Sequence, residues 1–437
     1  MMKDSGIEWI GEIPDEWQIQ KMNWICSLVT DYVANGSFAS LAENVEYLDE
    51  PDYAMLVRTV DVSGKGHTAK PVYISKHSYD FLCKSNLYGG EIILPNIGGV
   101  GEVFIVPKLY DRMSLAPNAI MIRTRFCDKY YFYYFSCDAG SRAIKQIAQS
   151  TAQAKFNKTD FKQIRALVPP IEEQLLVSSH LDKKCAEIDA VLEKTRESIE
   201  EYKKLKQAVI TEAVTKGVRG KREMKDSGVE WIGEIPVEWN TINPKALFTQ
   251  RKDKAKAGEK QLTASQQYGV IYQDEYMKLT GAKVVTVEKD FDILKHVECG
   301  DFVISMRSFQ GGLEYSTNTG SISSAYVMLI PNLDLVFPRF FKWLLKSQIY
   351  INALQSTSNL VRDGQAMRYS NFAQVRLYTV PIDEQQEIAD YLDKKITEID
   401  TLIAKKEALL EELETYKKSL IYEYVTGKKR VSETAHT

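Results

Sequence analysis

The chain carries one segment of sixteen residues twice, in nearly identical form. Residues 2–17 read MKDSGIEWIGEIPDEW and residues 224–239 read MKDSGVEWIGEIPVEW, which differ at only two positions. A second pair of segments, 170–215 and 381–426, aligns without a gap. Between the members of these pairs lie two stretches that do not resemble each other. Because internal repeats decide architecture before any local feature does, the sequence predicts a two-fold frame that holds two dissimilar inserts.

Composition indicates an ordinary globular chain. The 437 residues leave roughly 150 residues for each insert, which is enough for a separate core. A hydrophobic content of 44% and a charged content of 26% are usual for soluble proteins. No apolar run reaches the roughly 18 residues of a membrane span, and the N-terminal MMKDSGIEW is polar and lacks the apolar core expected of a signal peptide. The six cysteines are scattered without a CxxC pair, so we expect reduced thiols and a cytoplasmic location.

The second repeat predicts two long helices. No Gly or Pro occurs from Glu172 to Lys216, and Gly217 and Gly427 follow the two copies as helix stops. A seam in 3–4 spacing, interrupted by Thr195, Ser198 and Lys406, is expected to hold Ile188, Val191, Tyr202, Leu205 and Val209 in the first copy and Ile399, Leu402, Leu409, Leu413, Tyr416 and Leu420 in the second. We therefore predict an antiparallel coiled coil. A helix over 188–215 would be about 42 Å long, so it could act as a ruler between the inserts.

Both inserts mix strand-like and helix-like stretches. The apolar runs 92–96, 102–107, 119–123, 301–306 and 325–331 predict strands. An aromatic stretch follows in each insert, at 129–148 and 337–355, and a polar loop comes next. The aromatics from Tyr130 to Phe135 could stack on bases, but packing in a core is favoured. The fold class is therefore α+β, with two globular α/β domains joined by two long helices in a pseudo-two-fold repeat. Residues 2–17 and 224–239 both contain Gly and Pro, which break helices. We therefore expect each of these two segments to be an ordered loop that docks on an insert.

This layout resembles the specificity subunit of Type I restriction-modification enzymes. The resemblance rests on the paired WIGEIPxxW segments, on Pro-Ile-Glu-Glu-Gln at 170–174 and Pro-Ile-Asp-Glu-Gln at 381–385, on the LDKK…EID stretches and on the two rods. It implies target-recognition domain 1 at 1–168, a conserved helical region at 169–223, target-recognition domain 2 at 224–380 and a second conserved helical region at 381–437. The implied function is recognition of a bipartite double-stranded DNA target. The implied partners are two DNA adenine methyltransferase subunits and restriction or translocase subunits.

Charge distribution fits a DNA binder that shares its DNA with basic partners. The net charge is −3, but 18–168 holds 17 Lys and Arg against 14 Asp and Glu, and 240–380 holds 17 against 12. The inserts are thus mildly basic, at +3 and +5, and the frame is acidic. Since phosphate contacts dominate DNA affinity, mild basicity argues against a strong binder acting alone.

Arg, Lys, Asn and Gln read base edges and phosphates, so the polar loops hold the candidate DNA contacts. In the first insert these are Asn96, Gln153, Lys155, Asn157 and Lys158, and in the second they are Arg307, Ser308, Gln310, Arg362, Gln365 and Arg368. Asn96 and Arg307 each follow a predicted strand and precede a Gly pair, where DNA could approach closely. A solvated loop and a simple tight turn are the competing interpretations.

No catalytic motif is found in the sequence. Adenine-methyltransferase and P-loop motifs are missing, Gly98-Gly99-Val100-Gly101 lacks a dinucleotide-fold context, and the five histidines have no metal spacing. We therefore predict a subunit that is not an enzyme and has no cofactor, no metal site and no catalytic residue. The alternative is a coiled-coil interaction scaffold without sequence-specific DNA binding, which the acidic frame would also suit.

Overall fold

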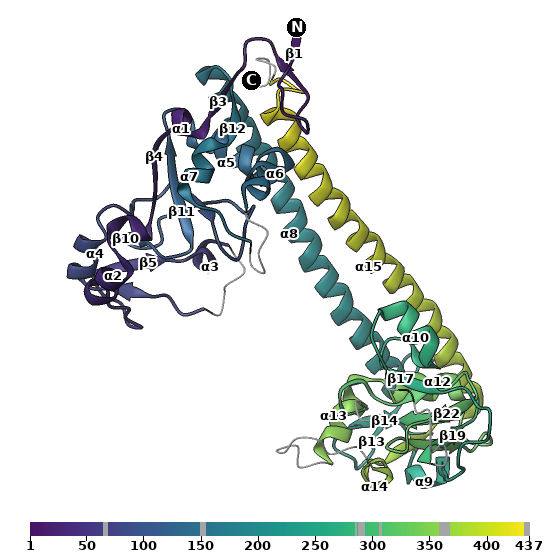
Figure 1. The fold of residues 1–437 in the computed structure, drawn as a ribbon. Coiled ribbons are helices and arrows are strands. Elements are labelled where there is room, and N and C mark those ends of the chain that lie inside the picture. The colour runs from purple at the N-terminus through teal and green to yellow at the C-terminus, as the bar shows by residue number, and fades with distance from the viewer. Residues whose placement is uncertain are drawn as a thin grey trace. The chain divides into compact units, whose positions relative to one another are not determined.

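The structure is a computed structural model that describes residues 1–63, 69–148, 154–284, 286, 293–305, 308–357 and 368–431. It has an α+β fold and divides into two compact units (Figure 1). Unit 1 comprises Met1–Thr195 and Ala408–Thr437, and unit 2 comprises Arg196–Glu407. Two long helices, α8 (Ile171–Lys216) and α15 (Ile382–Val425), each contribute one part to each unit.

The two inserts contain the same central sheet. In unit 1 its order is β4 (Cys26–Asp31), β11 (Ala119–Thr124), β8 (Ile92–Pro95) and β9 (Phe104–Ile105). In unit 2 it is β16 (Phe248–Arg251), β23 (Val327–Pro331), β20 (Phe302–Ile304) and β21 (Glu314–Tyr315). All neighbours in both sheets are antiparallel. The predicted likeness of the two inserts is therefore a shared topology.

Outside this sheet the inserts differ. Unit 1 adds a second four-stranded sheet of β6 (Tyr73–Ile74), β5 (Ala54–Val57), β10 (Met113–Leu115) and β7 (Asn86–Leu87), with η1 (Tyr32–Asn35), α2 (Phe38–Asn44), α3 (Thr59–Val62) and α4 (Lys76–Phe81). Unit 2 has two-stranded pairs instead, β17 (Leu262–Ser265) with β18 (Gly269–Tyr272) and β19 (Lys295–Val297) with β22 (Gly320–Ile322), and also α10 (Gln273–Thr280). These additions change the surface while the central sheet stays the same.

The aromatic stretches form helix pairs that pack against the sheets. They are α5 (Asp128–Ser136) with α6 (Asp138–Ile147) in unit 1 and α12 (Pro338–Leu344) with α13 (Gln348–Ser356) in unit 2. Tyr130, Tyr131, Tyr134 and Phe135 are fully buried in the main core of unit 1. The predicted core role of these aromatics is confirmed, so they are not surfaces for base stacking.

Each sixteen-residue repeat forms a small hairpin, where the sequence predicted an ordered loop. The strands are β1 (Met2–Asp4) with β2 (Glu12–Pro14) and β13 (Met224–Asp226) with β14 (Glu234–Pro236), in the same register. Trp17 and Trp239 follow the hairpins and are fully buried. Short two-stranded ladders, β3 (Gln18–Lys21) with β12 (Arg165–Val168) and β15 (Asn240–Ile242) with β24 (Leu377–Thr379), then close each insert onto its own ends.

The repeated Glu-Gln dipeptide joins each insert to its helix. The Trp17 indole N–H donates to Glu173 at 2.7 Å, and the Trp239 indole N–H donates to Glu384 at 3.0 Å. Gln174 and Gln385 each donate to the carbonyl five residues before them, and each accepts from the backbone N–H that precedes an aromatic helix. The motif therefore has the same structural role in both units.

The long helices run antiparallel in each unit, as predicted. In unit 1 the His180 ring lies 4.6 Å from the Tyr424 ring, and Lys417 bonds Asp189 at 2.6 Å. In unit 2 Lys406 lies over the Tyr202 ring and Lys206 bonds Asp400 at 2.6 Å. In both units, a higher residue number on α8 contacts a lower residue number on α15, which is the pattern of antiparallel helices.

The predicted seam needs a correction. The buried residues that face between the helices include Ile188, Leu192, Thr195, Ile199 and Ile399. Five predicted seam residues are instead well exposed: Val191 (47%), Leu205 (48%), Leu402 (40%), Leu409 (40%) and Tyr416 (53%). Both sets follow a 3–4 spacing from Ile188 and Ile399, so the pattern alone did not separate them. Thr195 can occupy a buried position of this seam because its hydroxyl donates to the Val191 carbonyl at 2.7 Å.

Candidate nucleic-acid interface

The two inserts present the same edge of the central sheet to their polar loops. In unit 1, β4 and β8 both run antiparallel to β11 and end together, with Asp31 opposite Ile120 and Pro95 opposite Ala119. In unit 2, β16 and β20 end together beside β23, as the registers of Arg251 with Met328 and of Ile304 with Val327 show. We call this the strand-end edge. Asn96 leaves it in unit 1 and the segment that contains Ser308 leaves it in unit 2.

The four described candidates of unit 1 gather at this edge. Asn96 donates through its side chain to the Phe156 carbonyl at 3.3 Å, and Phe156 N–H donates back to Asn96 at 3.2 Å. Asn157 caps α7 (Lys158–Gln163) by accepting from Asp160 N–H, and Lys158 pairs with Asp31 at 2.8 Å. Only Lys155 presents an exposed side chain with no such structural contact among the described residues.

Three candidates of unit 2 are described. Ser308 is fully buried in α11 (Ser308–Gly311), and its hydroxyl accepts from Ser305 N–H at 2.9 Å, so it has a structural role in place of the expected surface contact. Gln310 is exposed on the same short helix. Arg368 is exposed at the start of α14 (Tyr369–Gln374), where its N–H donates to Asn371 at 3.1 Å. Gln153, Arg307, Arg362 and Gln365 lie outside the described residues.

Hydrogen bonds link the unit 2 candidates. The Gln355 side chain on α13 donates to the Phe309 carbonyl on α11 at 2.6 Å. The Asn371 side chain on α14 donates to the Thr357 carbonyl at the end of α13 at 3.3 Å. The helices that carry Gln310 and Arg368 are thus tied to the same end of α13.

Two neighbouring hollows lie at the strand-end edge of unit 1. One of about 760 Å³ is lined by Tyr47, Arg58, Thr59, Pro95 and Asn118 among others, and one of about 460 Å³ shares Tyr47 and Asn118. Asn118 has φ of 70°, which is a conformation that Asn tolerates better than other residues with a side chain. Its carbonyl accepts from Asn96 N–H at 3.1 Å.

Exposed apolar side chains border the smaller hollow. Phe38 is 80% exposed, Tyr47 is 53% exposed and Val33 is 42% exposed. Sequence reasoning missed these residues because it sought only polar readers. Apolar contacts also serve DNA recognition, through thymine methyl groups or wedges between base steps. An Asn-Gly-Ser-Phe sequence just after a strand was the available signal.

Sequence reasoning also missed a basic segment in unit 2. Lys252, Lys254 and Lys256 follow β16 directly and all three are exposed. The segment leaves the strand-end edge at Arg251, whose guanidinium bonds Asp301 at 2.6 Å and Asp253 at 3.0 Å. The alternation of lysine with Asp and Ala after a predicted strand is the signal that the sequence offers for it.

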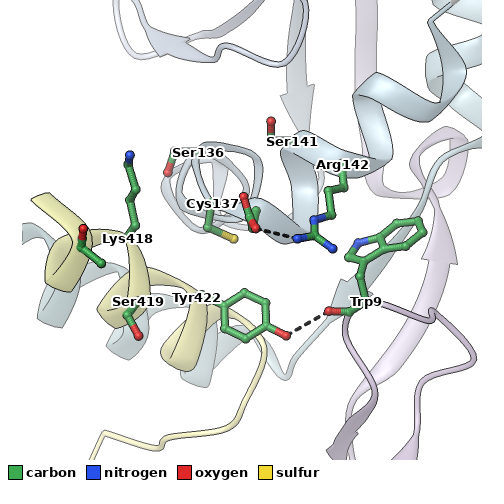
Figure 2. A pocket seen from close by; sticks show the side chains of 10 residues that line it. Trp9, Ser136, Cys137, Ser141, Arg142, Lys418, Ser419 and Tyr422 are labelled. Atoms are coloured by element: carbon green, nitrogen blue, oxygen red, sulfur yellow. Dashed lines mark hydrogen bonds and ion pairs between the residues drawn. The ribbon is translucent and has the colours of Figure 1, made fainter. Parts of the chain in front are cut away.

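A further hollow of about 540 Å³ lies in unit 1 between the first hairpin, the α5–α6 junction and α15 (Figure 2). The Trp9 indole donates to the Ala139 carbonyl, and the Tyr422 hydroxyl donates to the Trp9 carbonyl, both at 3.0 Å. Cys137 lies in its wall, where burial raises the pKa of the thiol to about 11, so the thiol stays protonated at neutral pH. This hollow marks the attachment of the hairpin to the frame and includes none of the candidate DNA contacts.

Family comparisons define the class of protein. Residues 14–201 match the family described as the Type I restriction modification DNA specificity domain. A protein of Methanocaldococcus jannaschii, described as a candidate specificity subunit of the type I restriction enzyme MjaX, is 24% identical over 97% of this chain and 96% of its own length. The MjaVIII specificity subunit of the same organism is 22% identical over 78% of this chain and 79% of its own length. Residues 14–201 thus match a Type I DNA specificity domain, and nearly the whole chain is similar to Type I restriction-modification specificity subunits.

Solved structures agree with this fold. A chain from a study of complex assembly and conformational transition in the type I R-M system superposes with a TM-score of 0.67, at 14% identity, over 95% of this chain and 99% of that one. The HsdS subunit from Thermoanaerobacter tengcongensis gives a TM-score of 0.52, also at 14% identity, over 95% and 98%. None of the described helices is both long and apolar enough to cross a lipid bilayer.

Proposed function

We propose that this chain is the sequence-specific DNA-recognition subunit of a Type I restriction-modification complex and that each unit reads one half of a bipartite target. One observation carries the proposal beyond the similarity to known specificity subunits. The same strand-end edge occurs in both inserts, yet the residues on it differ, with apolar Phe38 and Val33 in unit 1 and a lysine segment in unit 2. Equivalent placement with different chemistry is what two independent readers of two half-sites require.

The division of labour follows the sequence boundaries. Residues 1–168 and 224–380 are the target-recognition domains, and 169–223 and 381–437 are the conserved helical regions that set the spacer. Among the candidates, the exposed Lys155, Gln310 and Arg368 are the proposed direct contacts. Arg307, Arg362, Gln365 and Gln153 remain proposed contacts on sequence grounds. Asn96, Asn157 and Lys158 act mainly by shaping the edge, because their side chains have partners within the protein.

The exposed apolar residues of the long helices support partner binding. Each precedes a seam residue by one position, since Val191 comes before Leu192 and Leu402 before Ile403. When two helices pack antiparallel, the residues one position before Leu192 and Ile403 line one side of the pair. The residues one position after Ile188 and Ile399 line the opposite side. That opposite side is charged: Asp189 bonds Lys417 in unit 1, and Lys203 interacts electrostatically with Glu407 in unit 2. We call the first the apolar side.

The apolar side occurs once in each unit. Unit 1 contributes Val191, Leu409 and Tyr416, and unit 2 contributes Leu205 and Leu402. The gapless repeat relates Val191 to Leu402 and Leu205 to Tyr416. Two related exposed apolar surfaces suit two copies of one partner, which we propose are DNA adenine methyltransferase subunits. The chain itself would be non-catalytic, and restriction subunits would join through the same assembly.

The test is methylome sequencing of a methylation-free host that expresses this chain with its methyltransferase. A split methylated motif is expected. Exchange of residues 240–380 for those of another specificity subunit should change one half of that motif and leave the other half intact. A change in both halves together would contradict independent reading.

The interaction scaffold is the alternative function, and its support is the acidic frame. It predicts no methylated motif despite confirmed expression and complex formation. Binding of S-adenosylmethionine by the isolated chain in equilibrium dialysis would contradict the non-catalytic assignment.

A further inference from the structure

The segment after β16 combines exposed positive charge with a well-held backbone. We propose that Lys252, Lys254 and Lys256 form a phosphate-binding segment of the second recognition domain, which grips the DNA backbone beside the residues that read bases. This inference rests on the proposed DNA-recognition function and assigns a distinct task within it: sequence-independent affinity.

The acidic residues around the lysines are already committed to other partners. Asp253 and Asp301 both bond Arg251. Glu298 is hydrogen-bonded to Nε2 of the buried His296 imidazole at 2.7 Å, and a Glu259 carboxylate oxygen lies 2.7 Å from Nδ1 of the same ring. None of the three lysines forms an ion pair with a carboxylate in the described part of the chain. Lys256 also acts electrostatically on Glu298, whereas the charges of Lys252 and Lys254 are left for an external anion.

The backbone of the segment is held in place before any ligand binds. Ala255 N–H donates to the Leu294 carbonyl at 3.1 Å, and His296 N–H donates to the Asp253 carbonyl at 3.0 Å. Lys254 and Lys295 form an isolated antiparallel bridge. An ordered segment loses less conformational entropy when it binds than a free loop does. The alternating lysines are thus carried by an ordered, strand-like segment.

The position of the segment matches its proposed task. It leaves the strand-end edge at Arg251, and the segment that carries Gln310 leaves the same edge after Ile304. Phosphate contacts set the register of a protein on DNA while base contacts select the sequence. In unit 1 the chain after β4 has Tyr32 and Val33 at the equivalent place and no lysine before Phe38. Salt-dependent affinity should therefore depend more on the second domain.

The experiment measures binding of the full chain, in complex with its methyltransferase, to one duplex with the methylated motif and one without it, over a range of salt concentrations. Each neutralised phosphate contributes about 0.9 to the slope of log K against log salt. The variant K252Q/K254Q/K256Q should reduce the magnitude of that slope by about 2.7. It should weaken binding to both duplexes by the same factor and leave the methylated sequence unchanged. The variant K252R/K254R/K256R should keep the wild-type slope because it keeps the charges.

The matched control is K245Q. Lys245 is exposed on α9 (Pro244–Leu247), before the opposite end of β16, and its replacement should leave the slope unchanged. An unchanged slope in the triple Gln variant would overturn the inference, as would a changed methylated sequence. A wild-type complex that does not distinguish the two duplexes would instead contradict the proposed function, so the two failures can be told apart.

Discussion

At the scale of single residues, the frame motif uses one glutamate in each unit to accept a hydrogen bond from a tryptophan indole. Glu384 is 1% exposed and accepts from the Trp239 indole and from Arg222 at 2.5 Å, and the Arg222 side chain is only 13% exposed. Its counterpart Glu173 is 20% exposed, and its cation, Arg430, lies 3.7 Å away and is 54% exposed. The two copies of one motif therefore differ in how deeply their charges are buried.

This difference predicts unequal costs of mutation. Glu384→Ala should destabilise unit 2 by about 3–5 kcal/mol, because it leaves a buried guanidinium without its carboxylate. Glu173→Ala should lower the stability of unit 1 by about 1–3 kcal/mol, which is typical of a lost hydrogen bond to a charged group. Urea denaturation followed by the fluorescence of each unit's tryptophans measures both. Equal losses would show that burial does not set the cost.

At the scale of elements, the long helices have two unlike sides. Charged residues such as Asp189 and Lys203 flank the seam on one side, and Val191, Leu205, Leu402, Leu409 and Tyr416 form the apolar side on the other. In the described part of each unit these five side chains keep 40–53% of their surface exposed, so they contribute less to the stability of the helix pair than the buried seam residues do. Their exposure is better explained by a partner.

Replacement of Leu205 and Leu402 by Glu should therefore abolish binding of one methyltransferase subunit and change the melting temperature of the free chain little. Replacement of Val191 and Tyr416 by Glu should abolish binding of the other methyltransferase subunit. Sedimentation equilibrium of the mixed subunits counts the copies bound. The control K203Q/E407Q alters the charged side without changing net charge and should bind two copies. Full binding by the Glu variants would place the partner elsewhere.

At the scale of the whole molecule, the repeated frame gives each recognition domain the same kind of long helix. If the helices set the spacer, seven residues added to each helix at repeat-related positions lengthen the rod by about 10.5 Å. That corresponds to about three base pairs at about 3.4 Å per step. Methylome sequencing should show a spacer about three base pairs longer between unchanged half-sites. An unchanged spacer would show that the helix length does not set the distance between the half-sites.

Sequence alone determined the repeated frame, the antiparallel helices, the α+β class and the resemblance to Type I specificity subunits, because these depend on long patterns that survive local ambiguity. The topological equivalence of Asn96 and the Ser308 segment was also foreseeable, since each follows a strand. The seam register was not, because Val191 and Leu192 are both apolar and only their different burial in the fold separates them. The sheet order likewise became clear only once strands distant in sequence were paired.

The roles of individual polar residues were decided by tertiary structure. Asn157 and Lys158 looked like DNA contacts in a polar loop, but a helix cap and the partner Asp31, 127 residues away in sequence, occupy them. Lys252, Lys254 and Lys256 became notable only when the neighbouring carboxylates proved to be bound to Arg251 and His296. A sequence shows which charges exist, whereas a fold decides which of them are neutralised, because ion pairs form between residues that the chain brings together only on folding.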